Sequence, residues 1–362
     1  MCNNPESAAN QDRRDFIKTG GAAVAAFLAQ AALPSAARAM PAPAAAANPV
    51  NPATAKAMPT RNLGKTGYRV GIFSLGGQAA LEVGNNEAVA VPIVEKALDL
   101  GVNYLDTSSI YGGPERWSEQ YIGQVMKRRR SEAFLASKTI VRTRDASLKV
   151  LDESLKLLQT DHLDLWQLHD MGTMADVDKV FAKGGAMEAL QQALDQKMVR
   201  YLGITGHHRP DALMELIRRF PFDTALLALN AADKHHFSFK DELLPLAVEK
   251  QMGIIGMKVP ARGRILSTWT PPPLDKQEHS WEGSGAIAKT PGTLTMREAM
   301  FYTLSLPVST VIVGCDSQAQ LEENVQLARE FTPLSDTQMT ALNDKAEPVS
   351  KQSLFFRFLK RA

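Results

Sequence analysis

The feature that most constrains this fold is a regular alternation of short apolar runs with longer amphipathic segments. Eight mainly apolar runs of three to six residues lie at 72–76, 102–106, 133–137, 163–168, 201–205, 224–229, 254–257 and 311–313. Runs of this length are typical of strands that are buried on both faces. Helical patterns separate the runs, so the sequence predicts parallel strands joined by right-handed helical crossovers.

The helical patterns fill the intervals between the runs, at 88–100, 118–128, 146–159, 186–196, 211–219, 242–250, 296–305 and 318–330. Eight strand–helix units fit a closed barrel better than an open, doubly wound sheet. We therefore predict an α/β protein with a single-domain (β/α)8 TIM barrel over residues 59–335. An N-terminal hairpin is expected at 61–71, and long rim loops at 171–185 and 260–294. Residues 336–362 are expected to form a C-terminal tail that packs on the barrel or forms one wall of a substrate pocket.

The N-terminal region has the pattern of an export signal. Arg13 and Arg14 precede an alanine-rich, weakly apolar stretch over residues 21–33, and Ala37-Arg38-Ala39 has the small-x-small pattern of a cleavage site. In this order the features resemble a twin-arginine (Tat) signal peptide over residues 1–39; the alternative is a basic tail with an alanine-rich helix. The resemblance implies the Tat export machinery as a partner, cleavage after Ala39 and a periplasmic location. Residues 40–58, rich in Pro, Ala and Asn, predict a disordered linker.

Composition excludes several kinds of partner and site. The formal net charge of +2 gives no reason to expect nucleic acid as a partner. The two cysteines, Cys2 and Cys315, are too few for a disulfide framework or a Cys-ligated metal cluster. The histidine pairs at 207–208 and 235–236 are adjacent residues, which rarely point at one ion, so no metal site is expected. Beyond the signal, no apolar run reaches the roughly 20 residues that span a bilayer, so no stable membrane insertion is expected after cleavage.

Four residues with reactive side chains lie at or just after the ends of successive predicted strands: Asp106, Tyr111, Lys138 and His169. Neighbouring parallel strands are about 4.8 Å apart, so these side chains can meet at one rim. A nearby ammonium group lowers the pKa of a phenol, and a carboxylate can keep that ammonium protonated. We therefore expect Lys138 to lower the pKa of Tyr111, Asp106 to hold Lys138, and His169 to donate to a substrate oxygen. Each residue alone also has a structural explanation, such as a loop cap or surface packing.

The segments around these residues, at 103–112, 137–139 and 168–169, resemble the active site of the aldo-keto reductase family, and so does the late segment 312–324. The resemblance extends over residues 60–331. It implies a (β/α)8 barrel that binds NADP(H) or NAD(H) without a Rossmann fold. It also implies hydride transfer to a small-molecule carbonyl substrate, an aldehyde or ketone, or the reverse oxidation of an alcohol. In this scheme Tyr111 is the proton donor, Lys138 and Asp106 tune it, and His169 orients the substrate.

The resemblance also implies cofactor contacts, although some positions depart from the family pattern. Thr205 can replace the Ser of the family, whereas Gly206 stands where the family has Asn, a role for which Asn230 is the candidate here. Met257 stands where the family often stacks an aromatic ring on the nicotinamide, and a thioether can still pack there. The expected cofactor-binding residues are Thr205, Gly206, Asn230, Met257, Lys258, Gly314, Asp316, Gln320, Glu323 and Asn324.

The preference between the two nicotinamide cofactors depends on positions 315–320. Family members that prefer NADPH carry Arg or Lys there, but this chain has no cation in that segment and one carboxylate, Asp316. A carboxylate repels a 2′-phosphate and can hydrogen-bond to a ribose hydroxyl, which favours NAD(H). The habit of the family favours NADP(H), with Lys258, Arg262 or Arg264 as alternative sources of positive charge.

Two other functions compete with a carbonyl reductase. One is a non-catalytic barrel that binds a nicotinamide nucleotide as a sensor or structural part, which export would favour because free cofactor is not expected to be recycled outside the cytoplasm. The other is a barrel of a different reaction class, such as an isomerase or a lyase. Those enzymes usually need a metal ion or paired carboxylates, and the sequence shows neither pattern.

Overall fold

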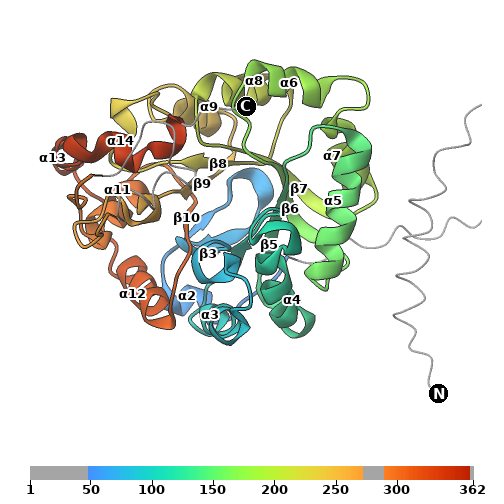
Figure 1. Ribbon diagram of the computed structural model, residues 1–362, viewed down its shortest axis with the longest axis horizontal. Helices are drawn as coiled ribbons and strands as arrows, with labels where there is room; N and C mark the ends of the chain where they lie inside the picture. Colours follow the sequence, from blue (N-terminus) through green and yellow to red (C-terminus); the bar gives the residue numbers. More distant parts are fainter. Residues whose placement is uncertain (1–47, 272–288, 359–362) are drawn as a thin grey trace, which may run out of the picture. The chain divides into compact units, whose positions relative to one another are not determined.

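The computed structural model describes residues 48–271 and 289–358. Eight parallel strands in these residues close a barrel in the order β10-β3-β4-β5-β6-β7-β8-β9 (Figure 1). Their bounds are β3 Phe73–Gly76, β4 Tyr104–Asp106, β5 Phe134–Thr139, β6 Leu163–Leu168, β7 Val199–Gly206, β8 Thr224–Ala228, β9 Gly253–Met257 and β10 Thr310–Val313. Each predicted apolar run overlaps one of these strands, so the predicted barrel is confirmed.

Helices surround the barrel in the positions that the amphipathic patterns predict (Figure 1). They are α3 Glu87–Asp99, α4 Trp117–Arg129, α5 Arg144–Leu157, α7 Ala186–Asp195, α8 Pro210–Arg219, α9 Leu243–Glu249, α11 Met296–Ser305 and α12 Gln318–Arg329. Each helix buries one face, as α8 does with Leu213 and Leu216, while the charged residues of α8 remain off that face. This division explains the 3.6-residue periodicity of the sequence, because only the face toward the strands must be apolar.

The register of the strands brings the carboxyl ends of β3 to β7 to the same rim. Asp106 lies opposite Gly76 on one side and Ala136 on the other. Lys138, two residues beyond Ala136 on β5, lies opposite Gln167 of β6. Side chains two residues apart on a strand point to the same face, so Lys138 projects above the level of Asp106.

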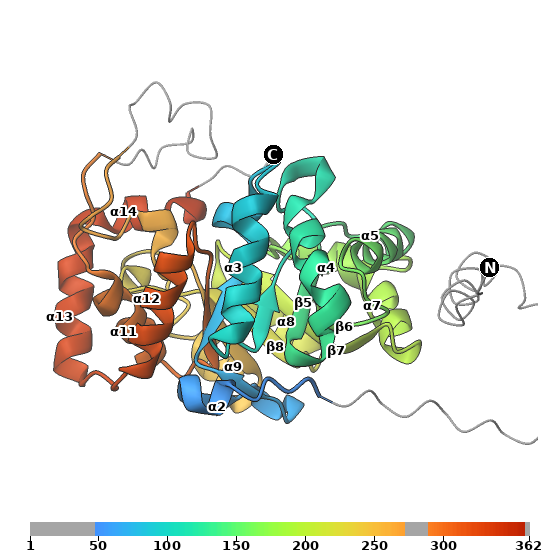
Figure 2. The ribbon, with the colours of Figure 1, turned by 90° about the horizontal axis from the view of Figure 1, so that it is seen from below.

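The predicted N-terminal hairpin is confirmed and covers the opposite, amino end of the barrel. Strands β1 Thr60–Asn62 and β2 Arg69–Gly71 pair antiparallel, and Figure 2 shows them and helix α2 Thr54–Ala57 at the end of the barrel opposite α14. Leu63 between the strands is fully buried. The hairpin therefore closes the barrel floor, away from the strand ends that carry the candidate residues.

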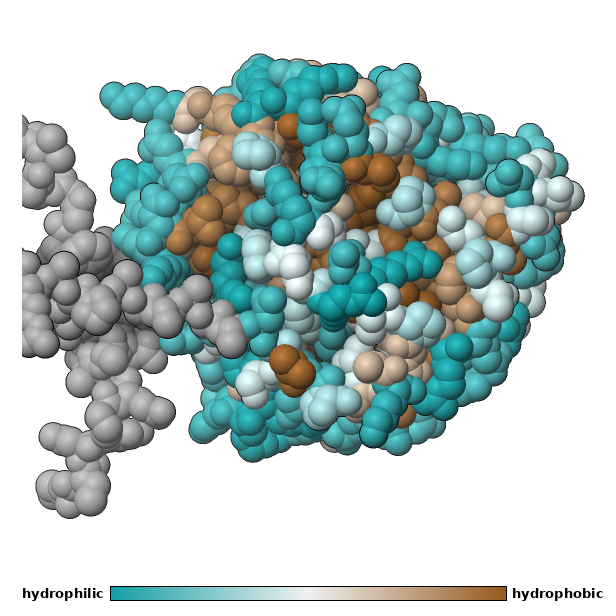
Figure 3. Space-filling view, turned by 180° about the vertical axis from the view of Figure 1, so that it is seen from behind, coloured by the Kyte–Doolittle hydropathy of each residue, from teal (hydrophilic) through white to brown (hydrophobic). Residues whose placement is uncertain are grey.

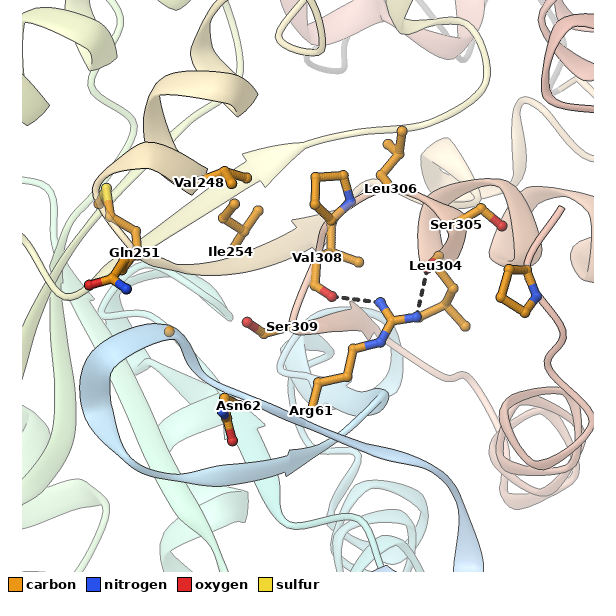
Figure 4. A pocket seen from close by; sticks show the side chains of 14 residues that line it. Arg61, Asn62, Val248, Gln251, Ile254, Leu304, Ser305, Leu306, Val308 and Ser309 are labelled. Carbon is orange, nitrogen blue, oxygen red and sulfur yellow. Dashed lines mark hydrogen bonds between the residues drawn. The ribbon is translucent and has the colours of Figure 1, made fainter. Parts of the chain in front are cut away.

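A hollow of about 610 Å³ lies beside the hairpin, at the amino ends of β9 and β10. Figure 4 shows it from close by, with Arg61 donating to the carbonyl oxygens of Val308 at 2.6 Å and Leu304 at 2.9 Å. Leu304 lies in the last turn of α11, where the helix dipole favours a cation. Arg61 therefore ties the hairpin to α11.

Figure 3 shows the face hidden in Figure 1, where hydrophobic side chains reach the surface between polar ones.

Two predicted segments are wrong in part. The disordered linker predicted at 40–58 is ordered over residues 48–58, because Asn51 donates to the carbonyl oxygens of Leu98 at 2.8 Å and Val102 at 3.2 Å, and α2 follows it. The rim loop predicted at 171–185 contains a helix, α6 Met174–Phe181, which packs against α7 and α8. Thr173 and Asp176 form a capping box at its start, a local signal that outweighs the loop-like composition. Residues 1–47, with the predicted signal, and residues 272–288 of the second rim loop lie outside the described residues.

The C-terminal region packs on the barrel through helices α13 Asp336–Ala346 and α14 Ser350–Ser353. Phe355 and Phe356, which follow α14, are buried. The guanidinium of Arg357 forms a buried ion pair with Asp233 and also donates to the carbonyl oxygen of Ala228 at 3.1 Å. The tail is therefore held next to the carboxyl end of β8. Within the described ranges, no helix combines the length and the apolar character that crossing a bilayer requires.

Candidate active site

The centre of the candidate site is a buried ion pair between neighbouring strands. Lys138 of β5 donates from Nζ to Oδ1 of Asp106 of β4 and to the carbonyl oxygen of Thr107 at 2.6 Å. Both charged side chains are about 1% exposed. Burial raises the pKa of Asp106 and lowers the pKa of Lys138, while the attraction between the two charges opposes both shifts. The expectation that Asp106 holds Lys138 agrees with this geometry.

Tyr111 reaches the same pair from the loop after β4. The Lys138 ammonium lies over its ring, 4.9 Å from the ring centroid. The turn depends on Gly112, which has a φ of 90° and on which a Cβ atom would lie 2.6 Å from the Trp117 nitrogen. Glycine is therefore needed directly after Tyr111, because other residues rarely adopt this conformation and a Cβ atom would not fit at such close approach.

His169 follows β6 and completes the group. Its backbone nitrogen donates to the carbonyl oxygen of Thr139 at 2.9 Å, and its Nδ1 lies 2.9 Å from Oγ of Ser108. The rings of His169 and Tyr111 stand edge to face with centroids 6.0 Å apart. Burial lowers the pKa of His169 well below its ordinary value, and Lys138 acts in the same direction, so the imidazole is neutral at pH 7. The structure thus brings together all four residues selected from the sequence.

One electrostatic expectation is wrong in direction. The pKa of Tyr111 lies well above its ordinary value, first because burial disfavours the phenolate and then because the charge of Asp106 is close. Lys138 does not reverse this shift, since its own charge is engaged by Asp106 and the Thr107 carbonyl oxygen. Tyr111 is therefore a protonated phenol at neutral pH, which is the form that a proton donor requires.

Sequence reasoning missed two buried polar residues behind the ion pair. Gln167 donates from Nε2 to Oδ2 of Asp106 at 3.3 Å. Glu119 accepts from Oγ of Ser137 at 2.7 Å and pairs with Arg116 at 3.2 Å, and burial raises the pKa of Glu119. A signal for Gln167 was present, because it is a polar residue within the apolar run 163–168.

A second group of titratable residues lies next to His169. Oδ1 of Asp170 lies 2.7 Å from Nδ1 of His207 and 3.4 Å from Nε2 of His208. Asp170 adopts a φ of 54°, and its backbone nitrogen donates to Oγ1 of Thr205 at 2.8 Å. Burial lowers the pKa of His207 to about 4, although Asp170 acts in the opposite direction. Residue types alone did not indicate that the carboxylate of Asp170 holds both imidazoles.

The expected cofactor residues of β7 and β8 are occupied by local contacts. Thr205 is buried and holds the backbone of Asp170. A Cβ atom on Gly206 would lie 2.6 Å from Cδ1 of Leu213 and 2.9 Å from the carbonyl oxygen of Met171, which explains why Asn is absent here. Asn230 donates to the carbonyl oxygen of Lys258 at 3.1 Å and so links the ends of β8 and β9.

The end of β9 supplies positive charge at the same rim. Met257 is buried, and Lys258, which follows it with a φ of 60°, donates to Oε1 of Gln78 at 3.0 Å. Nη2 of Arg262 lies 3.2 Å from Oε1 of Glu82. Burial lowers the pKa of Lys258 to about 7, and the charge of Arg262 contributes to this shift. The loop after β9 thus faces the loop after β3 with two cations.

The remaining expected cofactor residues lie around the start of α12. Gly314 stands against the loop after β3, since a Cβ atom there would lie 2.8 Å from the Gln78 carbonyl oxygen. The backbone nitrogen of Asp316 donates to Oε1 of Gln320 at 2.8 Å. Glu323 is exposed, whereas Asn324 is buried, with its Nδ2 3.5 Å from Sγ of Cys315.

These surroundings fit a bound dinucleotide. Gly314 carries no Cβ atom that would crowd the loop after β3, where such an atom would lie 2.8 Å from the Gln78 carbonyl oxygen. The cations of Lys258 and Arg262 could bind phosphate oxygens, and the carboxylates of Asp316 and Glu323 could accept hydrogen bonds from ribose or base groups. Among the described residues, no group of three or more His, Cys, Asp or Glu lies close enough together to hold a metal ion.

Comparisons with known proteins agree with this geometry. A model of the aldo/keto reductase family matches residues 69–347. L-galactose dehydrogenase of Arabidopsis thaliana is 30% identical over 312 residues, which cover 80% of this chain and 94% of that protein. The uncharacterized oxidoreductase YqkF of Bacillus subtilis is 28% identical over 75% of this chain and 91% of its own length. The holo form of the aldo-keto reductase AKR11C1 from Bacillus halodurans superposes with a TM-score of 0.63 at 27% identity, covering 80% of this chain and 96% of that one.

The family match spans nearly the whole barrel, and the relatives include named oxidoreductases. These findings give no support to a non-catalytic barrel. Enzymes of this family use nicotinamide cofactors, in keeping with the cations and carboxylates at the rim. The chain belongs to the aldo/keto reductase family and is an oxidoreductase that acts on carbonyl and alcohol groups.

Proposed function

We propose that Tyr111, His169 and the Asp106–Lys138 pair are the catalytic group of this reductase. The proposal depends on one observation: these side chains meet at one rim. They come from three successive strands and from the loop after the first of them, and Nζ of Lys138 lies 4.9 Å from the Tyr111 ring centroid. The nicotinamide cofactor supplies the hydride when it is bound. The chain itself must orient the carbonyl group and deliver a proton to its oxygen.

Each residue has a distinct part in that proton transfer. If Ser108 donates to Nδ1 of His169, the neutral ring carries its proton on Nε2 and can donate to the substrate oxygen. Tyr111 then gives its proton to the oxygen as negative charge develops there. Lys138, held by Asp106, stabilises the phenolate that remains. A protonated Tyr111 at neutral pH suits the direction of carbonyl reduction.

The test is turnover of purified protein, followed as carbonyl-dependent loss of reduced cofactor absorbance. Tyr111→Phe should lower kcat by about 10²–10⁴-fold, because a phenyl ring cannot donate a proton. Cofactor affinity, measured by quenching of protein fluorescence, should be unchanged, because the ring itself is kept. Activity in Tyr111→Phe close to that of the unmodified protein would exclude Tyr111 as the proton donor. The name of the Arabidopsis relative makes sugars one class of carbonyl compound to include.

For the cofactor, we propose a preference for NAD(H) over NADP(H). Asp316 precedes α12 and Glu323 lies within it, and both carboxylates are exposed. The nearby Lys96 is paired with Glu322 at 2.7 Å. A 2′-phosphate would meet negative charge here, whereas a ribose hydroxyl can donate to Asp316. The comparison of kcat/KM for NADH and NADPH tests this, and a higher value for NADPH would contradict it.

For location, we propose export to the periplasm through the Tat machinery, supported by Arg13 and Arg14 and by the apolar stretch and cleavage pattern that follow. The replacement of both arginines by lysine should retain the protein in the cytoplasm with its N-terminal segment uncleaved. Cell fractionation with immunoblotting measures this. Normal export of the double variant would contradict the proposal.

A further inference from the structure

Four aromatic rings form a continuous row at the mouth of the barrel. Tyr111 and His169 stand 6.0 Å apart, His169 and His207 6.4 Å, and His207 and Phe356 5.9 Å, measured between ring centroids. The first two belong to the proposed catalytic group, and Phe356 comes from the C-terminal tail. A substrate that places its carbonyl oxygen at Tyr111 and His169 and extends along this row meets His207 next.

The carboxylate of Asp170 determines which nitrogen of His207 carries the proton. A carboxylate only accepts hydrogen bonds, so Nδ1 of His207, 2.7 Å from Oδ1 of Asp170, must be the protonated nitrogen. The ring is neutral at pH 7, because burial lowers the pKa of His207 to about 4. Nε2 of His207 therefore carries a lone pair and can only accept a hydrogen bond.

Nε2 of His207 is free to bind a ligand. In the described part of the chain this nitrogen has no hydrogen-bond partner. It also does not belong to the buried polar atoms that lack a partner, so solvent or a ligand can reach it. The His207 side chain is 13% exposed. By contrast, the neighbouring His208 turns its Nε2 toward Asp170 at 3.4 Å, so a neutral His208 ring carries its lone pair on Nδ1, and its centroid lies 6.3 Å from that of His207.

We propose that His207 is a substrate-binding residue that accepts a hydrogen bond from a hydroxyl group on the carbon next to the reacting carbonyl. The inference rests on the proposed catalytic group, since it takes the carbonyl oxygen to lie at Tyr111 and His169. His169 offers a donor and His207 an acceptor, and this pair matches a carbonyl oxygen beside a hydroxyl. With hydrogen bonds of about 2.8 Å, two imidazoles whose centroids are 6.4 Å apart can reach oxygens on adjacent carbons. The substrate class is therefore α-hydroxy aldehydes and ketones.

Lactaldehyde and propanal form a matched pair of probes, because both have three carbons and differ only in the hydroxyl at carbon 2. The measured quantity is the ratio of their kcat/KM values with the complete enzyme and cofactor. The unmodified protein should prefer lactaldehyde about tenfold or more. His207→Phe, which keeps a ring of similar size without an acceptor, should reduce the ratio to about one. His207→Gln keeps an acceptor oxygen and should retain part of the preference.

His208→Phe is the control, because it changes the adjacent imidazole without removing the acceptor, and its ratio should stay within about twofold of the unmodified value. Circular dichroism confirms that each variant is folded. A ratio near one in the unmodified protein, or an unchanged ratio in both His207 variants, would overturn the role of His207 and leave the proposed function standing. If neither aldehyde is reduced and Tyr111→Phe changes nothing with any carbonyl compound, the proposed function itself fails, and the inference with it.

Discussion

Replacement of Lys138 by Met tests the buried ion pair by its effect on stability. Methionine keeps most of the apolar stem of Lys138 but leaves the Asp106 carboxylate buried without a counter-charge. The hydrogen bond that Asp106 then keeps within the described residues comes from Gln167, at 3.3 Å. A buried carboxylate without a counter-charge avoids most of the free-energy cost of desolvation by binding a proton. The cost of protonation therefore sets the size of the effect.

With an ordinary pKa near 3.9 for Asp, binding that proton at pH 7 costs about 4 kcal/mol. At pH 5 the same step costs about 1.5 kcal/mol. Loss of the Lys138 bond to the Thr107 carbonyl oxygen adds about 1 kcal/mol at either pH. We therefore expect Lys138→Met to reduce the free energy of unfolding by about 5 kcal/mol at pH 7 and by about half of that at pH 5. The sign follows because the folded variant holds a proton that the unfolded chain releases above pH 4.

Urea unfolding followed by tryptophan fluorescence at pH 5, 6 and 7 measures these differences. The control is the double variant Lys138→Met with Asp106→Asn, in which no buried charge remains. Its free energy of unfolding should differ from that of the unmodified protein by an amount that does not change between pH 5 and 7. A loss below about 1 kcal/mol for Lys138→Met at pH 7, or a loss independent of pH, would show that the pair is not a buried, charged one.

Three further predictions concern the rim and the tail. Burial lowers the pKa of Lys258 to about 7, and binding of the negatively charged cofactor should raise that pKa, so that binding takes up a proton. The Kd of the cofactor should therefore fall as the pH is lowered from 9 to 7. Calorimetry in two buffers should detect the proton uptake, and Lys258→Met should abolish it. Gly206→Asn should lower stability by about 1–3 kcal/mol, because its Cβ atom meets the Met171 carbonyl oxygen at 2.9 Å, and a urea midpoint equal to that of the unmodified protein would refute this. Arg357→Met should leave the Asp233 carboxylate without its counter-charge and lower the free energy of unfolding by about 3–5 kcal/mol. The measurement is limited proteolysis, in which the tail should be cleaved faster; an unchanged rate would mean that other contacts hold the tail.

The sequence by itself determined the barrel and selected the members of the proposed catalytic group. Strands buried on both faces are mainly apolar, so runs such as 163–168 can be recognised as strands without tertiary information. Once eight such runs alternate with helices, the carboxyl ends of the strands must share one rim. Asp106, Lys138 and His169 then lie together by topology, and Tyr111 follows from its short distance in sequence from Asp106.

The tertiary structure decided the properties that depend on burial and on exact neighbours. The pKa of Tyr111 rises rather than falls, because desolvation and the charge of Asp106 outweigh an ammonium that is already paired. Asp170 contacts His207 through its carboxylate while its backbone adopts a φ of 54° and donates to Thr205, a conformation that residue types do not predict. The hydropathy pattern reports which face of a strand or helix is buried, whereas the dielectric environment and the partner of each polar atom arise only when distant segments pack together.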